Sequence, residues 1–549
     1  MKNVDLLLTN ANILTLDGAN RVAKSVAVTK GRISGIWSQP EPPSNAVNMS
    51  AQTKVLNLRG ATVIPGFIET HNHILACAYL KGNVDCSSPL NTTIQDILNA
   101  IEEKAATMTA GEWIQGHSYD DTSLADKRHP TREDLDQAAP NHPVYITHIS
   151  GHIAVANSKA IELAGIDDDQ YTDNPHFGKD LAGRLNGVLY EAPAMNAFQT
   201  VLPVMDKSTF LERLGEAARD YVAQGITMTT DAGVWDQESL TIILEAAKTG
   251  IMPMRSQLMI MHSLLTEQGL FANYSASEVE QEIDKRSNGR ARLDSAKLFQ
   301  DGSIQGLTGA LRDPYYCNKE ENGQLFYEQA ALNEIISSLH QRGFRVAIHG
   351  NGDRAIGSIL EGFEYALQAM PRLDHRHRIE HVQTAALEDL DKMAELKVAG
   401  SFFINHVYYW GQRHEQIFLG PERAKRISPL KDAVDRNLLF TLHSDCPVTP
   451  ISPLFLIWAA VNRQTREGDI LGPDQKIDVM TALRAMTIDG AILNFQEQNC
   501  GSIEVGKYAD FAVLDKDLTT VNPLDIKDIE VLYTIIDGVV EYENKNVKV

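Results

Sequence analysis

The chain has 549 residues, of which 43% are hydrophobic and 22% are charged; this is the composition of a globular protein, and the length exceeds that of one minimal domain. The formal net charge is −22, and so acidic a surface repels phosphate groups, which argues against binding to nucleic acids or anionic membranes. Five cysteines without a CxxC pair indicate free thiols in a reducing compartment. Because the first residues lack the apolar core of a signal peptide and no run of about 18 apolar residues occurs, we expect a cytoplasmic protein without a membrane span.

Both ends of the chain show the pattern of short β-strands. Residues 4 to about 60 contain apolar runs separated by Asp-Gly, Lys-Gly and Arg-Gly pairs, which are typical of turns. Similar runs, GSIEVGKYADFAVLDKD and EVLYTIIDGVVEYEN, stand near the C-terminus. We therefore predict that residues 1–60 and 491–549 together form a small β-sandwich domain; two unrelated β appendages are the alternative.

The first motif with a chemical meaning is a pair of histidines, His71 and His73, that follows a short apolar run. The run extends from Thr62 to Ile68 and is typical of a buried strand. Residues two apart in a strand point to the same face, so both imidazoles can reach one metal ion from the end of this strand. Such pairs also occur as ordinary polar residues at strand ends.

Seven further strand-like runs alternate with helical patterns, so that eight strands are expected in all. They lie at 225–233, 252–260, 295–302, 344–350, 377–381, 398–403 and 438–445. Amphipathic helices between several of them end on a glycine, Gly250 or Gly343, a common helix C-cap. Eight β-α repeats predict a (β/α)8 TIM barrel over residues 61–490. A doubly wound open sheet is the alternative, although no glycine-rich phosphate loop follows the first strand.

The barrel pattern is interrupted by an insert at about residues 75–215. It combines helical segments, such as TIQDILNAIEEKAATM, with the irregular polar loops DKRHPTREDLD and DDDQYTDNPHFGKD. An insert after the first strand belongs on the C-terminal side of the strands, where such barrels carry their active sites. We predict a lid or substrate-pocket insert; a peripheral packing module is the alternative.

Residues that bind metals recur where the predicted barrel strands end. The set consists of His71, His73, Lys297, His349, His381 and Asp445. Strand ends converge on one mouth of a barrel, and nitrogen and oxygen ligands of this kind suit Zn²⁺ with an open position for water. Each residue alone has an ordinary alternative, such as an ion-paired lysine, a capping aspartate or a satisfied core histidine.

The motifs PGFIETHNH, KLFQDG, AIHGNGD, RIEHVQ and HSDCP, in this order, resemble those of the amidohydrolase superfamily. The chain is most similar to its YtcJ-like (amidohydrolase-3) branch, which includes N-substituted formamide deformylase and the exoenzyme regulatory protein AepA. The resemblance extends over nearly the whole chain, including WIQGHSYDDT in the insert and the tail GSIEVGKYADFAVLD.

The resemblance implies a centre of two divalent metal ions, for which Zn²⁺ is the expected metal. By this resemblance His71 and His73 bind the more buried ion, and His349 and His381 bind the second. Lys297 matches a lysine that CO2 converts to a carbamate bridging the two ions. A free ammonium group would repel Zn²⁺, whereas a carbamate is an anionic oxygen donor that two cations favour.

The implied activity is metal-dependent hydrolysis of a non-peptide C–N bond in a small N-acyl or N-formyl compound. Asp445 matches the aspartate that contacts the first metal and carries the proton from the attacking hydroxide to the leaving nitrogen. Donors for the substrate and its oxyanion are sought in the insert and after the seventh strand. The candidates are His148, His152, His406 and Trp410, and for the last two loop packing is the alternative.

Two other functions fit the same motifs. One is a deaminase or a cyclic amide or imide hydrolase, although the superfamily's deaminases generally use one metal and lack the residue that Lys297 matches. The other is a non-catalytic regulatory protein, against which the presence of all six candidate ligands argues. The expected partner is a small-molecule substrate, and a homodimer is expected because symmetric dimers are the commonest oligomers.

Overall fold

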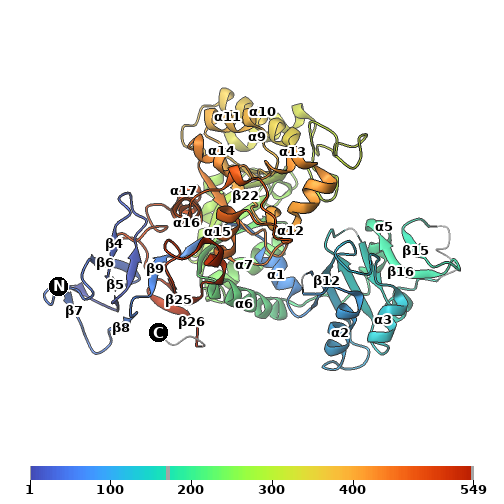
Figure 1. Cartoon of the computed structure of the whole chain (residues 1–549), viewed down its shortest axis with the longest axis horizontal. Coiled ribbons are helices and arrows are strands. Elements are labelled where there is room, and N and C mark those ends of the chain that lie inside the picture. Colours follow the sequence, from blue (N-terminus) through green and yellow to red (C-terminus); the bar gives the residue numbers. More distant parts are fainter. Residues whose placement is uncertain (1, 89, 152, 168–173, 546–549) are drawn as a thin grey trace. The chain divides into compact units, whose positions relative to one another are not determined.

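The computed structural model describes residues 2–88, 90–151, 153–167 and 174–545. The chain forms two compact units (Figure 1). The barrel unit comprises residues 1–78 and 214–549, and the inserted unit comprises residues 79–213. No helix among the described residues is long and apolar enough to cross a membrane.

The barrel unit is built on eight parallel strands that neighbour one another in chain order. They are β10 (Phe67–Asn72), β17 (Ile226–Val234), β18 (Arg255–Met261), β19 (Ala291–Phe299), β20 (Val346–Gly350), β21 (Arg378–His381), β22 (Ala399–Phe402) and β23 (Phe440–Leu442). The first and last strands meet, since the hydroxyl groups of Thr70 and Thr441 lie 2.8 Å apart. Nearly every strand residue is buried, as expected for a parallel sheet covered on both faces. The prediction of a (β/α)8 barrel is confirmed.

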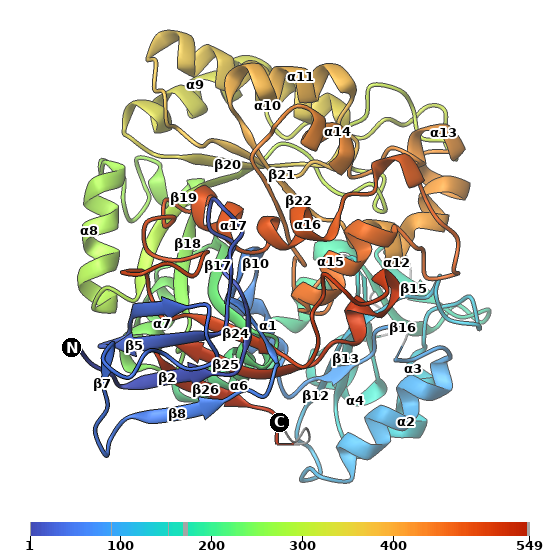
Figure 2. The same ribbon diagram turned by 60° about the vertical axis from the view of Figure 1, so that its left-hand side comes forward.

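Helices follow most of the strands on the outside of the barrel. They include α6 (Lys207–Ala223), α7 (Gln237–Thr249), α8 (Ala276–Ser287), α9 (Gln329–Gln341), α10 (Asp353–Ala369) and α11 (Leu387–Leu396). Figure 2 shows α9, α10 and α11 outside β20 and β21. The carboxylate of Asp236 caps the first turn of α7, and Gly250 ends that helix with a φ of 79°, a left-handed conformation that glycine adopts without strain.

Strands from both chain ends combine in the same unit, as predicted. One sheet has the order β6 (Arg32–Trp37), β5 (Ser25–Thr29), β2 (Leu6–Thr9) and β8 (Lys54–Asn57). The other has the order β26 (Val539–Glu543), β25 (Val531–Ile536), β24 (Phe511–Leu514), β9 (Thr62–Pro65), β3 (Asn12–Leu14) and β4 (Val22–Ala23). Buried side chains of both sheets, such as Leu8, Val26, Val63 and Phe511, share one apolar core. This contact explains why the two ends fold together.

The apolar run before the histidine pair is not one strand, contrary to the prediction. It divides at Gly66: β9 pairs with β24 in the sheet of the chain ends, whereas β10 pairs with β17 in the barrel. A Cβ atom on Gly66 would lie 2.1 Å from the Cγ2 atom of Thr227, so only glycine allows the chain to cross between the sheets here. His71 therefore lies near the end of β10, and His73 follows the strand.

The inserted unit contains a mixed sheet that the sequence did not reveal. Its order is β11 (Val84–Asp85), β12 (Ile114–Tyr119), β13 (Val144–His148), β14 (Ile153–Ala156), β16 (Leu185–Tyr190) and β15 (Phe177–Lys179). Strands such as IQGHSY carry Gly, His and Ser, which weaken the alternating pattern that marks a strand. The polar segment DKRHPTREDLD was also misassigned, because Thr131 and Asp134 form a capping box that starts α3 (Arg132–Ala138).

Candidate functional site

The barrel brings the six predicted metal ligands to the C-terminal ends of its strands. His71 lies in β10 and His73 just after it, Lys297 in β19, His349 in β20, His381 at the end of β21, and Asp445 three residues after β23. The ring centroids of His71 and His381 are 4.9 Å apart, and those of His349 and His381 are 4.3 Å apart. The residues thus form one cluster.

His71, His73 and Asp445 form the first group within this cluster. Oδ1 of Asp445 lies 3.3 Å from Nε2 of His71 and 3.2 Å from Nε2 of His73. This oxygen has no hydrogen-bond partner of good geometry among the described residues. The three atoms lie within 4.8 Å of one another, an arrangement that could hold a metal ion.

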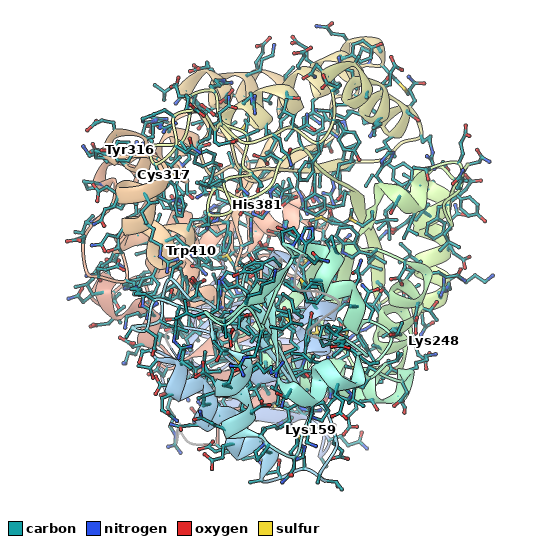
Figure 3. The ribbon with its side chains drawn as sticks, turned by 90° about the vertical axis from the view of Figure 1, so that its right-hand side faces the viewer. Lys159, Lys248, Tyr316, Cys317, His381 and Trp410 are labelled. Carbon is teal, nitrogen blue, oxygen red and sulfur yellow. The ribbon has the colours of Figure 1, made fainter. Side chains whose placement is uncertain are left out.

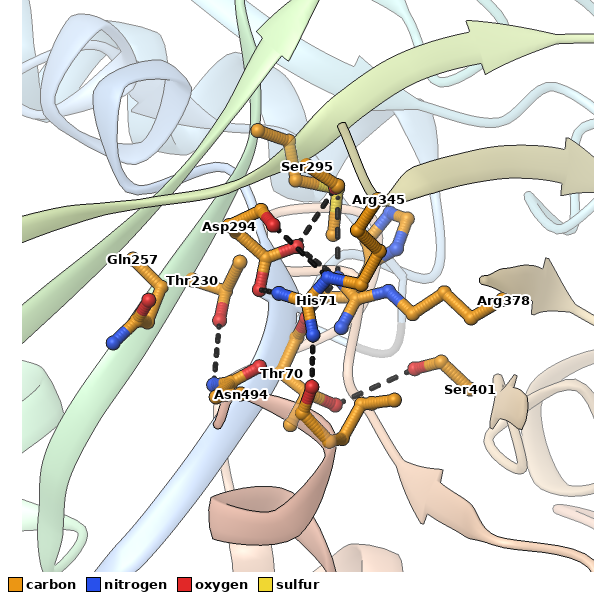
Figure 4. A network of polar contacts seen from close by, with 12 residues as sticks. Thr70, His71, Thr230, Gln257, Asp294, Ser295, Arg345, Arg378, Ser401 and Asn494 are labelled. Atoms are coloured by element: carbon orange, nitrogen blue, oxygen red, sulfur yellow. Dashed lines mark hydrogen bonds and ion pairs between the residues drawn. The ribbon is translucent and has the colours of Figure 1, made fainter. Parts of the chain in front are cut away.

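A chain of buried charges fixes the orientation of His71, and Figure 4 labels three of the residues concerned, His71, Arg378 and Asp294. Its Nδ1 atom lies 2.6 Å from Oε2 of Glu380, whose Oε1 accepts a 2.5 Å hydrogen bond from Arg378. Arg378 also pairs with Asp294 at 3.2 Å. Burial raises the pKa of Glu380, but Arg378 and His71 outweigh it and hold that pKa well below its usual value. An ionised Glu380 keeps the proton of His71 on Nδ1 and leaves Nε2 unprotonated, at 3.3 Å from Oδ1 of Asp445.

His443 belongs to the cluster, although the sequence did not single it out. Its ring stacks on that of His71 at a centroid distance of 4.5 Å, and its Nε2 atom lies 3.2 Å from Nδ1 of His381. His71, His381 and His443 form a second group whose ligand atoms lie within 4.8 Å of one another. The position of His443 two residues before Asp445, at the end of a strand, was the available signal.

Lys297 lies in the buried wall of the barrel, in β19. It is fully buried, and its Nζ atom has no hydrogen-bond partner among the described residues. Burial lowers the pKa of Lys297 to about 8. An ammonium group in this position is costly because a buried charge needs pairing and hydrogen bonds.

Asp301 is a second residue that the sequence did not single out. Its carboxylate accepts hydrogen bonds from the backbone N–H groups of Ala310, Asn351 and Gly352, so it holds the loop that follows β20. Burial raises the pKa of Asp301 to about 7. This loop supports His349, whose Nε2 atom lies 2.9 Å from Nδ2 of Asn351.

The two substrate candidates after the seventh strand lie beside the cluster. His406 begins α12 (His406–Arg413), and its ring is 4.2 Å from that of Phe403, which in turn is 5.4 Å from His443. Burial lowers the pKa of His406 to about 3, so its imidazole is neutral. Trp410 lies 5.7 Å from His406, and Figure 3 labels it together with His381 of the cluster.

The two substrate candidates in the insert, His148 and His152, belong to the inserted unit of residues 79–213. Nε2 of His148 lies 3.1 Å from Oδ1 of Asp121, and its Nδ1 atom accepts a hydrogen bond from the backbone N–H of Ser150. With Asp120 and Asp121, His148 forms a further group whose ligand atoms lie within 4.8 Å of one another. His152 lies outside the described residues.

Comparison with known proteins covers nearly the whole chain. Residues 54–542 match the family model described as the amidohydrolase family. N-substituted formamide deformylase of Arthrobacter pascens is 30% identical over 546 residues, which cover 98% of each chain. The putative amidohydrolase YtcJ of Bacillus subtilis is 26% identical over 508 residues, covering 90% of this chain and 91% of that one. The crystal structure of an uncharacterized metal-dependent hydrolase from Pyrococcus horikoshii shares the fold, with a TM-score of 0.73 and 22% identity over 94% of this chain and 99% of that chain.

Proposed function

Because the chain belongs to the amidohydrolase family and is 30% identical to an N-substituted formamide deformylase, we propose that it hydrolyses an N-acyl or N-formyl bond of a small molecule. The resemblance seen in the sequence is confirmed by the family match and by the two relatives. The observation that carries the proposal is the convergence of His71, His73 and Asp445 on one point at the barrel mouth.

The donor atoms fit divalent metal ions. Nε2 of His71, which carries no proton in this tautomer, lies 3.3 Å from a carboxylate oxygen of Asp445. Two electron-rich atoms at this distance repel each other, and a cation between them turns the repulsion into coordination. We assign one ion to His71, His73 and Asp445 and a second to His349 and His381. Zn²⁺ suits this mixture of imidazole and carboxylate ligands.

The unpartnered Lys297 is explained if it carries a carbamate. Its neutral amine would attack CO2, forming an N–C bond and releasing one proton, and the product is an anionic group with two oxygen donors. A pKa lowered to about 8 by burial increases the fraction of the neutral amine near pH 7. The carbamate would replace a buried cation without a partner by a ligand shared between the two ions.

The mechanism assigns each step to residues of this chain. When bound, divalent ions supply the Lewis acidity that activates a water molecule and polarises a carbonyl group. Asp445 accepts the proton of the attacking water on a carboxylate oxygen and delivers it to the leaving nitrogen. We assign the hydrogen bond to the developing oxyanion to His406, which is buried and neutral and whose Nδ1 atom has no partner among the described residues. Trp410 and Phe403 pack around His406 and limit the access of water.

The experiment combines metal analysis with a substrate screen. The purified chain is analysed for bound metals and assayed against N-formyl and N-acyl amines, with cyclic imides and amino-purines as representatives of the alternative activities. We expect about two Zn²⁺ per chain and hydrolysis of at least one acyclic amide. His71→Ala should lose metal and turnover, whereas His262→Ala, which alters a strand-end histidine outside the cluster, should lose neither. Deamination without amide hydrolysis would refute the proposal.

A further inference from the structure

Two cysteine side chains face each other beside the histidine cluster. Cys77 lies in α1 (Ile74–Leu80), and Cys446 directly follows Asp445. Their Sγ atoms are 3.4 Å apart, although the residues are 369 positions apart in the chain. Both are free thiols, with Cys77 half-buried and Cys446 buried. This contact has no part in the mechanism described above.

Backbone hydrogen bonds hold the two cysteines in this position. The N–H of His73 donates to the carbonyl oxygen of Cys446 at 2.7 Å, and the N–H of Cys77 donates to the carbonyl oxygen of His73 at 2.9 Å. The segments that carry the thiols are therefore joined through a residue of the cluster. The approach of the two sulfur atoms is a property of the barrel closure between its first and last strands.

The hydroxyl group of Tyr221 completes the surroundings of the thiols. It donates a hydrogen bond to Oδ1 of Asn72 at 3.0 Å and lies 3.5 Å from Sγ of Cys77. Asn72 stands between the two histidines of the pair and is held in turn by Thr229 and Thr230. The wall behind Cys77 is thus rigidly built, so a displacement of its sulfur is transmitted to the segment of His71 and His73.

We propose that Cys77 and Cys446 are a modification site at which a peroxide forms a disulfide that inactivates the centre. Sγ of Cys77, the more accessible of the two, attacks one oxygen of the peroxide, and the O–O bond breaks to give a sulfenic acid and water. Sγ of Cys446 then attacks Sγ of Cys77 and displaces the hydroxyl group as a second water. In total, two thiols lose two electrons and two protons to one hydrogen peroxide, which becomes two waters.

Inactivation follows from what the disulfide would move. A disulfide requires the sulfur atoms to approach from 3.4 Å to about 2.05 Å. The movement draws α1 and the segment after β23 together. His73 directly precedes α1 and Asp445 lies in that segment, and their Nε2 and Oδ1 atoms are 3.2 Å apart. The effect on turnover rests on the proposed function, whereas formation of the disulfide does not.

The test treats the metal-loaded full chain with hydrogen peroxide. Cys317 is exposed and would react first, so the reference protein carries Cys317→Ser. After alkylation of the remaining thiols, digestion without reductant and mass spectrometry should find the peptides of Cys77 and Cys446 joined. Hydrolysis of the N-formyl or N-acyl substrate should fall on the order of 100-fold, since a displacement of about 1 Å in an active site has effects of this size, and dithiothreitol should restore it.

Cys77→Ser and Cys446→Ser, each in the same background, are the matched controls and should keep their activity in peroxide. Failure to find the joined peptides while other thiols are oxidised would overturn the site. Joined peptides with unchanged turnover would overturn the inactivation. If the untreated protein hydrolyses no amide at all, the proposed function fails, but the joined peptides remain a separate result that supports the site.

Discussion

Oε2 of Glu380 lies 2.6 Å from Nδ1 of His71, and both side chains are buried. Glu380 is held from the other side by Arg378, which pairs with Asp294. Because the positively charged Arg378 lies next to it, the carboxylate of Glu380 is already ionised before a metal ion binds. A carboxylate bonded to the other ring nitrogen sets both the orientation and the basicity of a histidine that binds a metal.

Replacing Glu380 should therefore weaken metal binding without removing a ligand. In Glu380→Gln the side-chain amide can present an N–H group to His71, which favours the tautomer with its proton on Nε2. We expect metal affinity to fall by about 10- to 100-fold, measured by competition with a chelator of known affinity. Glu388→Gln, which neutralises an exposed carboxylate in α11, should bind metal like the unaltered protein. Equal affinities of the two variants would contradict this role of Glu380.

Asp445→Asn tests the proton carrier. The amide keeps the shape of the carboxylate but cannot accept the proton of the attacking water. The kcat for amide hydrolysis should fall by roughly 10²- to 10⁴-fold, the usual contribution of general acid–base catalysis. Metal content is measured on the same samples, so that loss of the ion is separated from loss of the proton carrier. Asp474→Asn, at an exposed position, serves as the comparison, and near-normal turnover in Asp445→Asn would exclude the assigned role.

Lys297→Ala tests the carbamate. Removing the side chain leaves a buried space beside the histidines and should abolish turnover together with the binding of at least one metal ion. A short carboxylate such as acetate can enter this space and supply the missing oxygen ligands, so we expect activity to be partly restored by acetate plus Zn²⁺. Chloride at the same ionic strength should restore nothing. A variant that keeps full activity without any carboxylate would show that Lys297 is not a bridging ligand.

The fold and much of the site could be predicted because both depend on local pattern. Alternation of strands and helices predicted the barrel, and the rule that strand ends converge then predicted that His71, Lys297 and Asp445 share one mouth. The pattern could not show the division of the first run at Gly66, because the run is apolar on both sides of this residue and its two parts differ only in their partner sheets. His443 was missed for a related reason. It belongs to the histidine cluster because its ring stacks on that of His71, which lies 372 residues away in the chain.

A group of three histidines away from the metal ligands predicts how stability depends on pH. Nε2 of His377 lies 2.8 Å from Nδ1 of His340, and Nδ1 of His377 accepts the backbone N–H of Val346 at 3.0 Å. Nδ1 of His375 likewise accepts the backbone N–H of His377 at 2.9 Å. An additional proton on His377 would point at an N–H group, so the folded protein accommodates its neutral form only.

Burial lowers the pKa of His340 and of His375, and that of His377 lies well below its usual value for the same reason. Below the ordinary histidine pKa of about 6.5, the unfolded chain binds protons that the folded chain does not, so stability is complete above this pH and is lost as the pH falls through it. Each histidine that stays neutral in the folded protein should cost about 1.4 kcal/mol of unfolding free energy per pH unit below 6.5.

The test compares the unaltered protein with His377→Asn, which keeps an acceptor for Val346 but does not titrate. Urea unfolding at pH 7.0 and 5.5 should show the variant as the less stable protein at pH 7.0, and the difference between the two proteins should narrow at pH 5.5. Two curves that fall in parallel with pH would mean that His377 is protonated in the folded protein after all.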